Sequence, residues 1–186
     1  MPDPTPDIRT VLDAASFAAR AHRHQVRNDG QTPYAAHPFR VCLIVRHVFG
    51  IEDAEILAAA LLHDTLEDTT TDFDDLGERF GPRVTRWVAA LTKDKRLPDD
   101  EREAAYGAVL AAAEPAVKIA KLADIFDNLS DSRHLPPAGR RRTVERSRKY
   151  LTALENDPAD VVRPPLGIVR RLVEEVERSV ATETVS

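Results

Sequence analysis

The stretch that most constrains the fold is residues 56–68, where an apolar run leads directly into ionisable side chains. Residues 56–62 read Ile-Leu-Ala-Ala-Ala-Leu-Leu, and they are followed by His63, Asp64, Glu67 and Asp68. A segment that is apolar on nearly every side predicts a buried helix. On that helix His63 and Glu67 are four residues apart, as are Asp64 and Asp68, so each pair is expected to share one face.

Three carboxylates therefore crowd the C-terminal end of this predicted helix, where the helix dipole already disfavours negative charge. A cation is expected to offset them, and a divalent metal ion would do so. The alternative is an acidic helix end that is simply exposed to solvent and binds nothing. Other parts of the chain have to distinguish the two interpretations.

The composition indicates one globular domain with neither nucleic acid nor a membrane as its partner. With 186 residues, 42% hydrophobic and 31% charged, the chain is long enough for one sizeable core. A net charge of −5 argues against a general nucleic-acid binder. No apolar run approaches the roughly 20 residues of a membrane span. Without a signal-like N-terminal segment, and with Cys42 as the only cysteine, we expect a cytoplasmic protein.

Apolar positions at helical spacing run along the whole chain. Residues 24–36 hold turn signals and predict a loop, and Pro38 suits the first turn of the helix that follows. The run Val41–Val45 is also compatible with a buried strand, but the pattern continues to Phe49 and stops at Gly50, which favours a helix. The expected helices span about residues 7–23, 39–49, 53–67, 72–80, 82–91, 101–113, 116–129, 139–155 and 166–178.

No alternating strand pattern, internal repeat or dividing linker is present. We therefore expect residues 1–186 to form a single all-α domain, a compact bundle of roughly eight to ten helices. Residues 1–6, which contain three prolines, and residues 179–186 are expected to be loose tails.

Two further positions can complete a metal site around His63 and Asp64. A mononuclear site for a first-row transition metal needs imidazole nitrogens and carboxylate oxygens that converge from separate elements. His37 lies at the start of one predicted helix and Asp124 on a later one. Each also has a simpler possible role: His37 can cap a helix or hydrogen-bond a loop, and Asp124 can pair with Lys121 or Arg27. Only when His37 and Asp124 are taken together with His63 and Asp64 does the sequence predict one bound ion.

Taken in order, these motifs resemble the HD-domain metal-dependent phosphohydrolases, and more narrowly the alarmone hydrolase domain of the RelA/SpoT group. The matching strings cover about residues 10–155, in a layout similar to the stand-alone small alarmone hydrolases of the animal Mesh1 type. They are Ala-His-Arg-His-Gln-Val-Arg over 21–27, Thr-Pro-Tyr-Ala-Ala-His-Pro over 32–38, Ala-Ala-Leu-Leu-His-Asp-Thr-Leu-Glu-Asp over 59–68, and Lys-Leu-Ala-Asp over 121–124 with Asn128.

This resemblance implies an all-α HD fold with a manganese ion held by His37, His63, Asp64 and Asp124. It implies a hydrolase that removes the 3′-pyrophosphate of guanosine tetra- or pentaphosphate, giving GDP or GTP and pyrophosphate. Such an ion polarises a phosphoryl oxygen and lowers the pKa of a bound water, which suits hydrolysis near neutral pH.

The resemblance also assigns roles to residues around the ion. Glu67 and Asp68 are the expected catalytic residues, which orient the attacking water or move its proton. Arg27 offers a planar cation to the diphosphate, with a solvated loop arginine as the alternative. Tyr150 is the candidate for stacking on the nucleobase, although core packing is the more frequent role of such a tyrosine. The full set of expected substrate-binding residues is Arg27, Asn128, Lys121 and Tyr150.

Three positions depart from the family pattern. Asn28 and Ile125 stand where the family usually has basic residues, and Asp127 stands where it usually has an aromatic residue or histidine. The first two remove positive charge near a highly anionic substrate, and the third adds a negative charge. We therefore expect the metal ligands to be complete and the identity of the substrate to be the open question.

The leading hypothesis is a manganese-dependent 3′-pyrophosphohydrolase of guanosine tetra- and pentaphosphate. The alternative is an HD-family hydrolase of another phosphorylated nucleotide, such as the 2′-phosphate of NADPH or a nucleoside monophosphate. A non-catalytic nucleotide sensor is a third hypothesis, and the presence of Glu67 and Asp68 counts against it because a sensor needs no water-activating carboxylates. The sequence leaves the oligomeric state open between monomer and homodimer.

Overall fold

The apolar run that ends at Leu62 forms a helix in the core, as expected. Helix α3 (Ala54–Leu62) buries every residue from Leu57 to Leu62. The Asp53 carboxylate caps its first turn by accepting hydrogen bonds from the backbone N–H groups of Glu55 and Ile56, at 2.9 and 3.2 Å. Around α3 pack four other helices, α1 (Thr5–Ala21), α2 (Ala36–Leu43), α5 (Phe73–Leu91) and α7 (Pro115–Ser130).

The computed structural model describes residues 5–155 and 159–183, and the all-α prediction is confirmed for them. The one β feature among these residues is an isolated bridge between Val26 and Pro33. The remaining elements are the π-helical turn η1 (Ile44–Val48), α4 (Thr65–Asp68), α6 (Asp99–Ala112), the 3₁₀ turn η2 (Asp131–His134), α8 (Pro137–Leu154) and α9 (Arg163–Glu183).

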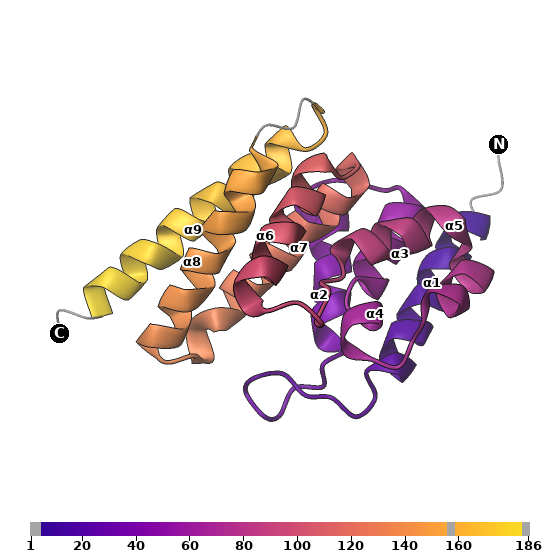
Figure 1. Ribbon diagram of the computed structural model, residues 1–186, viewed down its shortest axis with the longest axis horizontal. Coiled ribbons are helices and arrows are strands. Elements are labelled where there is room, and N and C mark those ends of the chain that lie inside the picture. The colour runs from indigo at the N-terminus through magenta and orange to yellow at the C-terminus, as the bar shows by residue number, and fades with distance from the viewer. Residues whose placement is uncertain (1–4, 156–158, 184–186) are drawn as a thin grey trace.

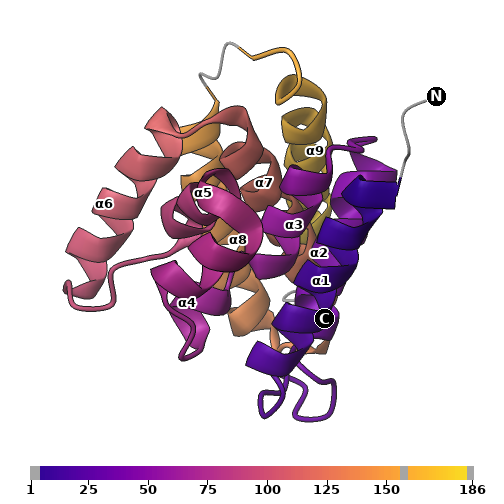
Figure 2. The same ribbon diagram turned by 90° about the vertical axis from the view of Figure 1, so that its right-hand side faces the viewer.

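Helix α7 joins the two ends of the molecule. Helices α8 and α9 lie side by side at one end, and α1 to α5 gather at the other (Figure 1). α7 packs against α2, α3 and α5 on one side and against α8 and α9 on the other. Seen along the long axis, α1 and α6 lie on opposite flanks, with α3, α5 and α7 between them (Figure 2). Because 12 of its 16 residues are buried, α7 is part of the core along almost its whole length.

The single helix expected over residues 53–67 is wrong, because the chain turns at His63 and Asp64. α3 ends at Leu62, Asp64 has φ −99° and ψ −3°, and α4 begins at Thr65. The Thr65 hydroxyl donates a hydrogen bond of 2.7 Å to the carbonyl of Leu62, which satisfies one of the acceptors left open at the helix end. His63 therefore lies in the turn after α3 and Glu67 on α4, and the two do not share one face of a single helix.

The segment containing Val41–Val45 is helical, as favoured over a strand. It runs through α2 into the π-helical turn η1, and it ends before Gly50, whose φ of 71° is left-handed. α2 begins at Ala36, so His37 and Pro38 both lie in its first turn. The two helices expected over 72–80 and 82–91 meet at a kink in α5, where Gly81 has φ 78° and ψ 166°.

The ends of the chain differ from expectation where they are described. α1 starts at Thr5 and α9 continues to Glu183, so residues 5–6 and 179–183 are helical and not loose. The rest of both expected tails, residues 1–4 and 184–186, lies outside the described part. Pro164 and Pro165, which precede the helix expected over 166–178, stand in the first turn of α9, where proline is tolerated because the N–H groups there have no helical partner.

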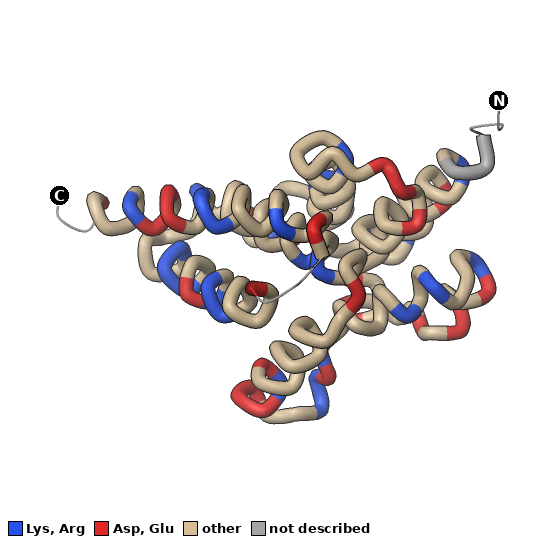
Figure 3. The backbone as a smooth tube through the Cα atoms, turned by 90° about the horizontal axis from the view of Figure 1, so that it is seen from above, with Lys and Arg blue, Asp and Glu red and all other residues tan. Residues whose placement is uncertain are grey.

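Charged residues of both signs are interspersed along the helices (Figure 3). α9 carries arginines and glutamates in close succession, and all of its buried residues are apolar. Within residues 5–155 and 159–183, none of the helices combines the length and apolar character that spanning a membrane requires.

Because α7 is buried, we expect substitutions of its core residues to lower the free energy of unfolding. Leu122 is fully buried, so Leu122→Ala should lower the free energy of unfolding by about 2–5 kcal/mol, through lost burial and a residual cavity. Leu12→Ala on α1, where the leucine is 58% exposed, is the matched control and should change it by less than about 0.5 kcal/mol. Urea denaturation measures both, and equal small effects would contradict a core position for α7.

Candidate active site

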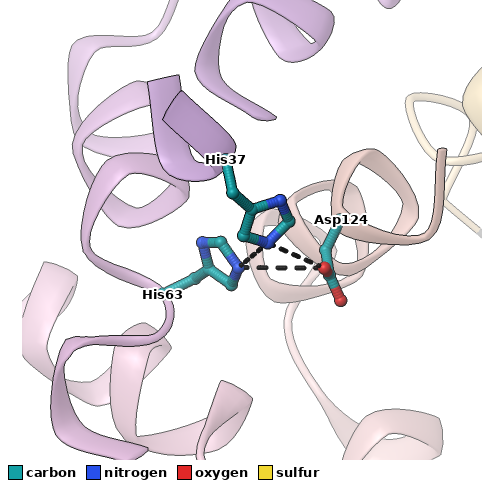
Figure 4. Close-up of side chains that lie close together, drawn as sticks. All are labelled: His37, His63 and Asp124. Atoms are coloured by element: carbon teal, nitrogen blue, oxygen red, sulfur yellow. Dashed lines mark hydrogen bonds and ion pairs between the residues drawn. The ribbon is translucent and has the colours of Figure 1, made fainter. Parts of the chain in front are cut away.

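Three side chains that could ligate a metal ion meet where α2, α3 and α7 come together (Figure 4). His37 comes from the first turn of α2, His63 from the end of α3 and Asp124 from α7. Nε2 of His37 is 3.2 Å from Nε2 of His63 and 3.3 Å from Oδ1 of Asp124. Nε2 of His63 is 3.8 Å from the same oxygen. Residues 26 to 87 positions apart are thus brought to one point.

Asp64, the fourth predicted ligand, lies beside the same point. Its Oδ2 atom is 3.0 Å from Nε2 of His63 and 3.4 Å from Nε2 of His37. The Tyr34 hydroxyl donates a hydrogen bond of 2.6 Å to this oxygen, which holds the carboxylate in place. The turn after α3 therefore allows adjacent residues, His63 and Asp64, to face one centre.

Both imidazoles turn Nε2 toward the centre. Nδ1 of His63 lies 2.8 Å from the carbonyl oxygen of Ala60, and since a carbonyl can only accept, Nδ1 carries the proton. Nδ1 of His37 faces a carboxylate, Oδ2 of Asp127, at 2.7 Å. A neutral imidazole protonated at Nδ1 leaves the lone pair of Nε2 free to ligate a metal ion.

The electrostatics of the cluster favour a positive charge. Burial disfavours the charged imidazole of His37, but hydrogen bonds to Asp124, Asp127 and Asp64 outweigh it and hold its pKa well above the usual value. Burial also raises the pKa of Asp124, yet nearby Lys121 and the imidazole of His37 lower it more, and the carboxyl stays ionised. A divalent cation bound at this point would supply the same positive charge.

The geometry fits a first-row divalent ion. Bonds of about 2.0–2.2 Å from such an ion to nitrogen and oxygen ligands place neighbouring ligand atoms about 3 to 3.5 Å apart. The distances of the two Nε2 atoms from each other and from Oδ2 of Asp64 and Oδ1 of Asp124 run from 3.0 to 3.8 Å, and the ligand atoms of His37, His63 and Asp124 are all mutually close. Two imidazoles and two carboxylates form a donor set suited to manganese, iron or zinc. The assignment of each residue as a ligand remains a prediction.

A pocket of about 200 Å³ opens beside this cluster. Glu67 lies on its wall, and the backbone N–H of Lys93 donates a hydrogen bond of 3.0 Å to Oε2 of Glu67. Burial raises the pKa of Glu67 despite that bond. Asp68 does not line the pocket, and its Oδ1 atom accepts a 2.6 Å hydrogen bond from Nζ of Lys95. The structure therefore brings Glu67, of the two expected catalytic carboxylates, to the pocket.

Lys121, one of the expected substrate-binding residues, is buried. Its Nζ atom donates a 2.8 Å hydrogen bond to Oδ2 of Asp124 and lies 4.5 Å from the centre of the Tyr150 ring and 5.2 Å from that of Tyr106. Interaction with Asp124 outweighs burial and raises the pKa of Lys121, so the side chain stays charged. Lys121 thus neutralises the outer oxygen of a predicted ligand.

Tyr150 lines the pocket, but the residue is only 5% exposed. Its hydroxyl donates a 2.6 Å hydrogen bond to Glu103 and accepts one of 2.5 Å from Nζ of Lys93. The ring therefore both packs in the protein and borders the pocket. Stacking of Tyr150 on a nucleobase stays a prediction.

Arg27 is held in place by two residues of the α7 end and is not a solvated loop arginine, since its side chain is 9% exposed. Nε and Nη2 lie 3.1 and 2.9 Å from Oδ2 of Asp131, and Nη2 donates to Oδ1 of Asn128 at 3.1 Å. Asn128 in turn donates a 2.5 Å hydrogen bond to Oδ1 of Asp124. Arg27 and Asn128 are thereby connected to the predicted ligand.

The prediction that Asp127 lies near the substrate is wrong. Its carboxylate was expected to add negative charge near the substrate, but the residue is 2% exposed and does not line the pocket. It contacts His37 and Arg40 instead, with Arg40 Nε 2.7 Å from Oδ1. The sequence did carry a signal. Asp127 follows Asp124 by three residues and Arg40 follows His37 by three, so each shares a helix face with a predicted ligand.

Comparisons with known proteins place this site in a family. A family model described as an HD domain matches residues 14–154, a range that includes all four predicted ligands. The guanosine-3′,5′-bis(diphosphate) 3′-pyrophosphohydrolase MESH1 of Homo sapiens is 45% identical over 130 residues, 69% of this chain and 73% of that protein. MESH1 of Drosophila melanogaster is 39% identical over 141 residues, 75% of this chain and 78% of that protein.

The fold agrees with this relationship. A solved structure described as a metazoan ortholog of SpoT that hydrolyses ppGpp matches with a TM-score of 0.77 and 30% identity, covering 92% of this chain and 97% of that one. The chain therefore belongs to the HD domain family. Within the family it is a Mesh1-like HD hydrolase.

The cluster predicts that divalent metal stabilises the fold. After removal of metal with EDTA, adding Mn²⁺ at a hundred times its Kd should stabilise the protein by about 2.7 kcal/mol and raise Tm. Asp64→Ala should lose most of this shift, because an anionic ligand is removed. Asp94→Ala, which removes an exposed aspartate paired with Arg96, should retain it. Differential scanning calorimetry measures the shift, and an unchanged shift in Asp64→Ala would refute its role as a ligand.

Proposed function

We propose that the protein is a metal-dependent hydrolase that removes the 3′-pyrophosphate from guanosine 3′,5′-bis(diphosphate) and its pentaphosphate form. The products are GDP or GTP and pyrophosphate. The observation that carries this proposal is the meeting of His37, His63, Asp64 and Asp124 beside a pocket, in a chain 45% identical to human MESH1.

Manganese is the proposed ion, and His37, His63, Asp64 and Asp124 are its proposed ligands. Mixed imidazole and carboxylate ligation suits Mn²⁺ but also other first-row ions, whose intrinsic affinities are higher, so the supply of metal decides which is loaded. When bound, the ion supplies Lewis acidity toward a phosphoryl oxygen and a water of lowered pKa.

Glu67 is the proposed general base. Its carboxylate lines the pocket with one oxygen fixed by the Lys93 backbone N–H, and burial raises its pKa, which makes the ionised carboxylate a stronger base. Water attacks the phosphorus bonded to the 3′ oxygen of the nucleotide. The bond from that phosphorus to the 3′ oxygen breaks, pyrophosphate is released carrying the oxygen of the water, and the 3′ oxygen takes up the proton that Glu67 removed from the water. Asp68 is the next residue, and its carboxylate accepts a hydrogen bond from Lys95. We propose that it helps to orient the water or to move its proton.

Substrate contacts are proposed for residues around the pocket. Lys93, Lys121 and Arg146 line it and supply positive potential for the phosphates. Asn128 lines the pocket as well, while Arg27 lies behind it and holds its amide. Tyr150 forms part of the wall on which a nucleobase can rest.

A second candidate function rests on Ile125. This residue lines the pocket where the family usually has a basic side chain, so one positive charge is missing near the phosphates. A hydrolase of a less highly charged nucleotide, such as the 2′-phosphate of NADPH or a nucleoside monophosphate, would tolerate that loss. Its product would be inorganic phosphate and not pyrophosphate.

The products of the reaction test the proposal. EDTA-treated protein reloaded with Mn²⁺ is incubated with ppGpp, and nucleotides are separated by anion-exchange chromatography while pyrophosphate and phosphate are assayed separately. GDP and pyrophosphate in equal amounts are expected. No conversion of ppGpp, together with phosphate release from NADPH or a nucleoside monophosphate, would replace the proposal with the second candidate.

Glu67→Gln separates catalysis from metal binding. Because the amide cannot accept the proton from water, turnover should fall ~10²-fold or more, while metal content stays at the wild-type level. Steady-state kinetics and elemental analysis measure the two quantities. Glu55→Gln, which removes an exposed carboxylate paired with Arg83, should change neither. Loss of metal together with activity in Glu67→Gln would instead make Glu67 a ligand.

A further inference from the structure

His37 is held between two carboxylates of the same helix. Asp124 and Asp127 lie three residues apart on α7, and both reach the imidazole. Oδ1 of Asp124 lies 3.3 Å from Nε2, and Oδ2 of Asp127 lies 2.7 Å from Nδ1 on the other side of the ring. One carboxylate therefore faces the metal centre with His37, and the other stands behind it.

The contact behind the ring decides how His37 can act. A carboxylate at Nδ1 holds a proton there, which leaves Nε2 as a lone pair facing His63 and Asp64. An anionic acceptor also makes the imidazole a stronger donor to a metal ion. His63 obtains the same orientation from a backbone carbonyl, that of Ala60. The acceptor at Nδ1 of His63 is thus a neutral backbone group, which a side-chain substitution does not remove. The acceptor at Nδ1 of His37 is a charged side chain, which a substitution can change.

Arg40 keeps that buried carboxylate in position. Its Nε atom lies 2.7 Å from Oδ1 of Asp127 and its Nη2 atom 3.0 Å from Oδ2, a two-pronged contact that fixes the plane of the carboxylate. Without a partner a buried carboxylate is strongly destabilising. Arg40 is three residues after His37 on α2, so one helix presents both partners to Asp127. Nη2 of Arg40 also lies 3.1 Å from Asp131, which holds Arg27.

We propose that Asp127 and Arg40 are a positioning pair that orients His37 for metal binding. Asp127 is one of the positions at which the chain departs from the family pattern, so this support is a property of this chain. The inference rests on the metal site of the proposed function. Neither residue touches the substrate pocket, and both act through His37.

The hydrogen-bond donors around Asp127 determine which substitutions can test the proposal. Both oxygens of Asp127 accept from donors, so in Asp127→Asn the amide NH₂ must face either His37 or Arg40. The double variant Arg40→Gln with Asp127→Asn removes this conflict, because the new glutamine can accept from the new amide. It also leaves no unpaired buried charge, so it is the variant expected to fold normally.

The first measurement is the Kd for Mn²⁺, obtained by competition with a fluorescent chelator on metal-stripped protein. The single and double variants should both bind Mn²⁺ about 10–100-fold more weakly than wild type. The matched control is Arg83→Gln with Glu55→Gln, which removes an exposed pair of the same charges. Its Kd should stay within about twofold of wild type. Circular dichroism and Tm show that each variant is folded.

The second measurement is a proton NMR signal that mere packing would not change. In Zn²⁺-loaded protein the Nδ1 proton of His37 should resonate far downfield, as expected for a bond to a carboxylate. In the double variant it should move upfield, because the acceptor is a neutral amide. The Nδ1 proton of His63, bonded to the Ala60 carbonyl, is the internal reference and should not move.

The outcomes separate this inference from the proposed function. A folded double variant that binds Mn²⁺ within about twofold of wild type, with the His37 signal unmoved, overturns the positioning role. So does an equal loss of affinity in the control. If the wild-type protein itself binds no divalent ion, the proposed function fails and the inference fails with it. Weakened binding confined to the Asp127 variants supports the inference.

Discussion

The structure depends on a cluster of carboxylates and imidazoles brought together inside a helical bundle. Oxygens of Asp64 and Asp124 lie 3.0 to 3.8 Å from the Nε2 atoms of two histidines, and such a group is stable only with positive charge nearby. Lys121 neutralises one side. Because α2, α3 and α7 each supply part of the cluster, the site can form only when these three helices pack together.

The two imidazoles reach the same orientation by different supports. The backbone carbonyl of Ala60 holds His63, and a charged side-chain pair, Asp127 with Arg40, holds His37. A carboxylate that looks unfavourable beside an anionic substrate is therefore directed away from the pocket. Asp127 contacts the predicted ligand His37, whereas Ile125 is the departure that lines the pocket.

Residue patterns could predict the helices and the ligand candidates, but not the turn between them. Leu57 to Leu62 are apolar on every side, and all are buried. The apolar pattern did not indicate that α3 ends at Leu62. At that turn the Thr65 hydroxyl bonds to the Leu62 carbonyl, and the Asp64 carboxylate lies near His37 of α2. The burial of Lys121 was not predictable in the same way, since a lysine is normally exposed, and here Asp124 and two tyrosine rings contact its charged end.

The sequence by itself determined the all-α class, the buried helix and the residue types able to bind a metal ion, because periodicity and side-chain chemistry are local properties. Only the tertiary structure decided which of them meet. It placed Glu67 on the pocket and Asp68 beside Lys95, and it joined Asp127 to His37 across 90 positions. Contacts between distant helices depend on how whole faces pack, and that information is spread over the entire core.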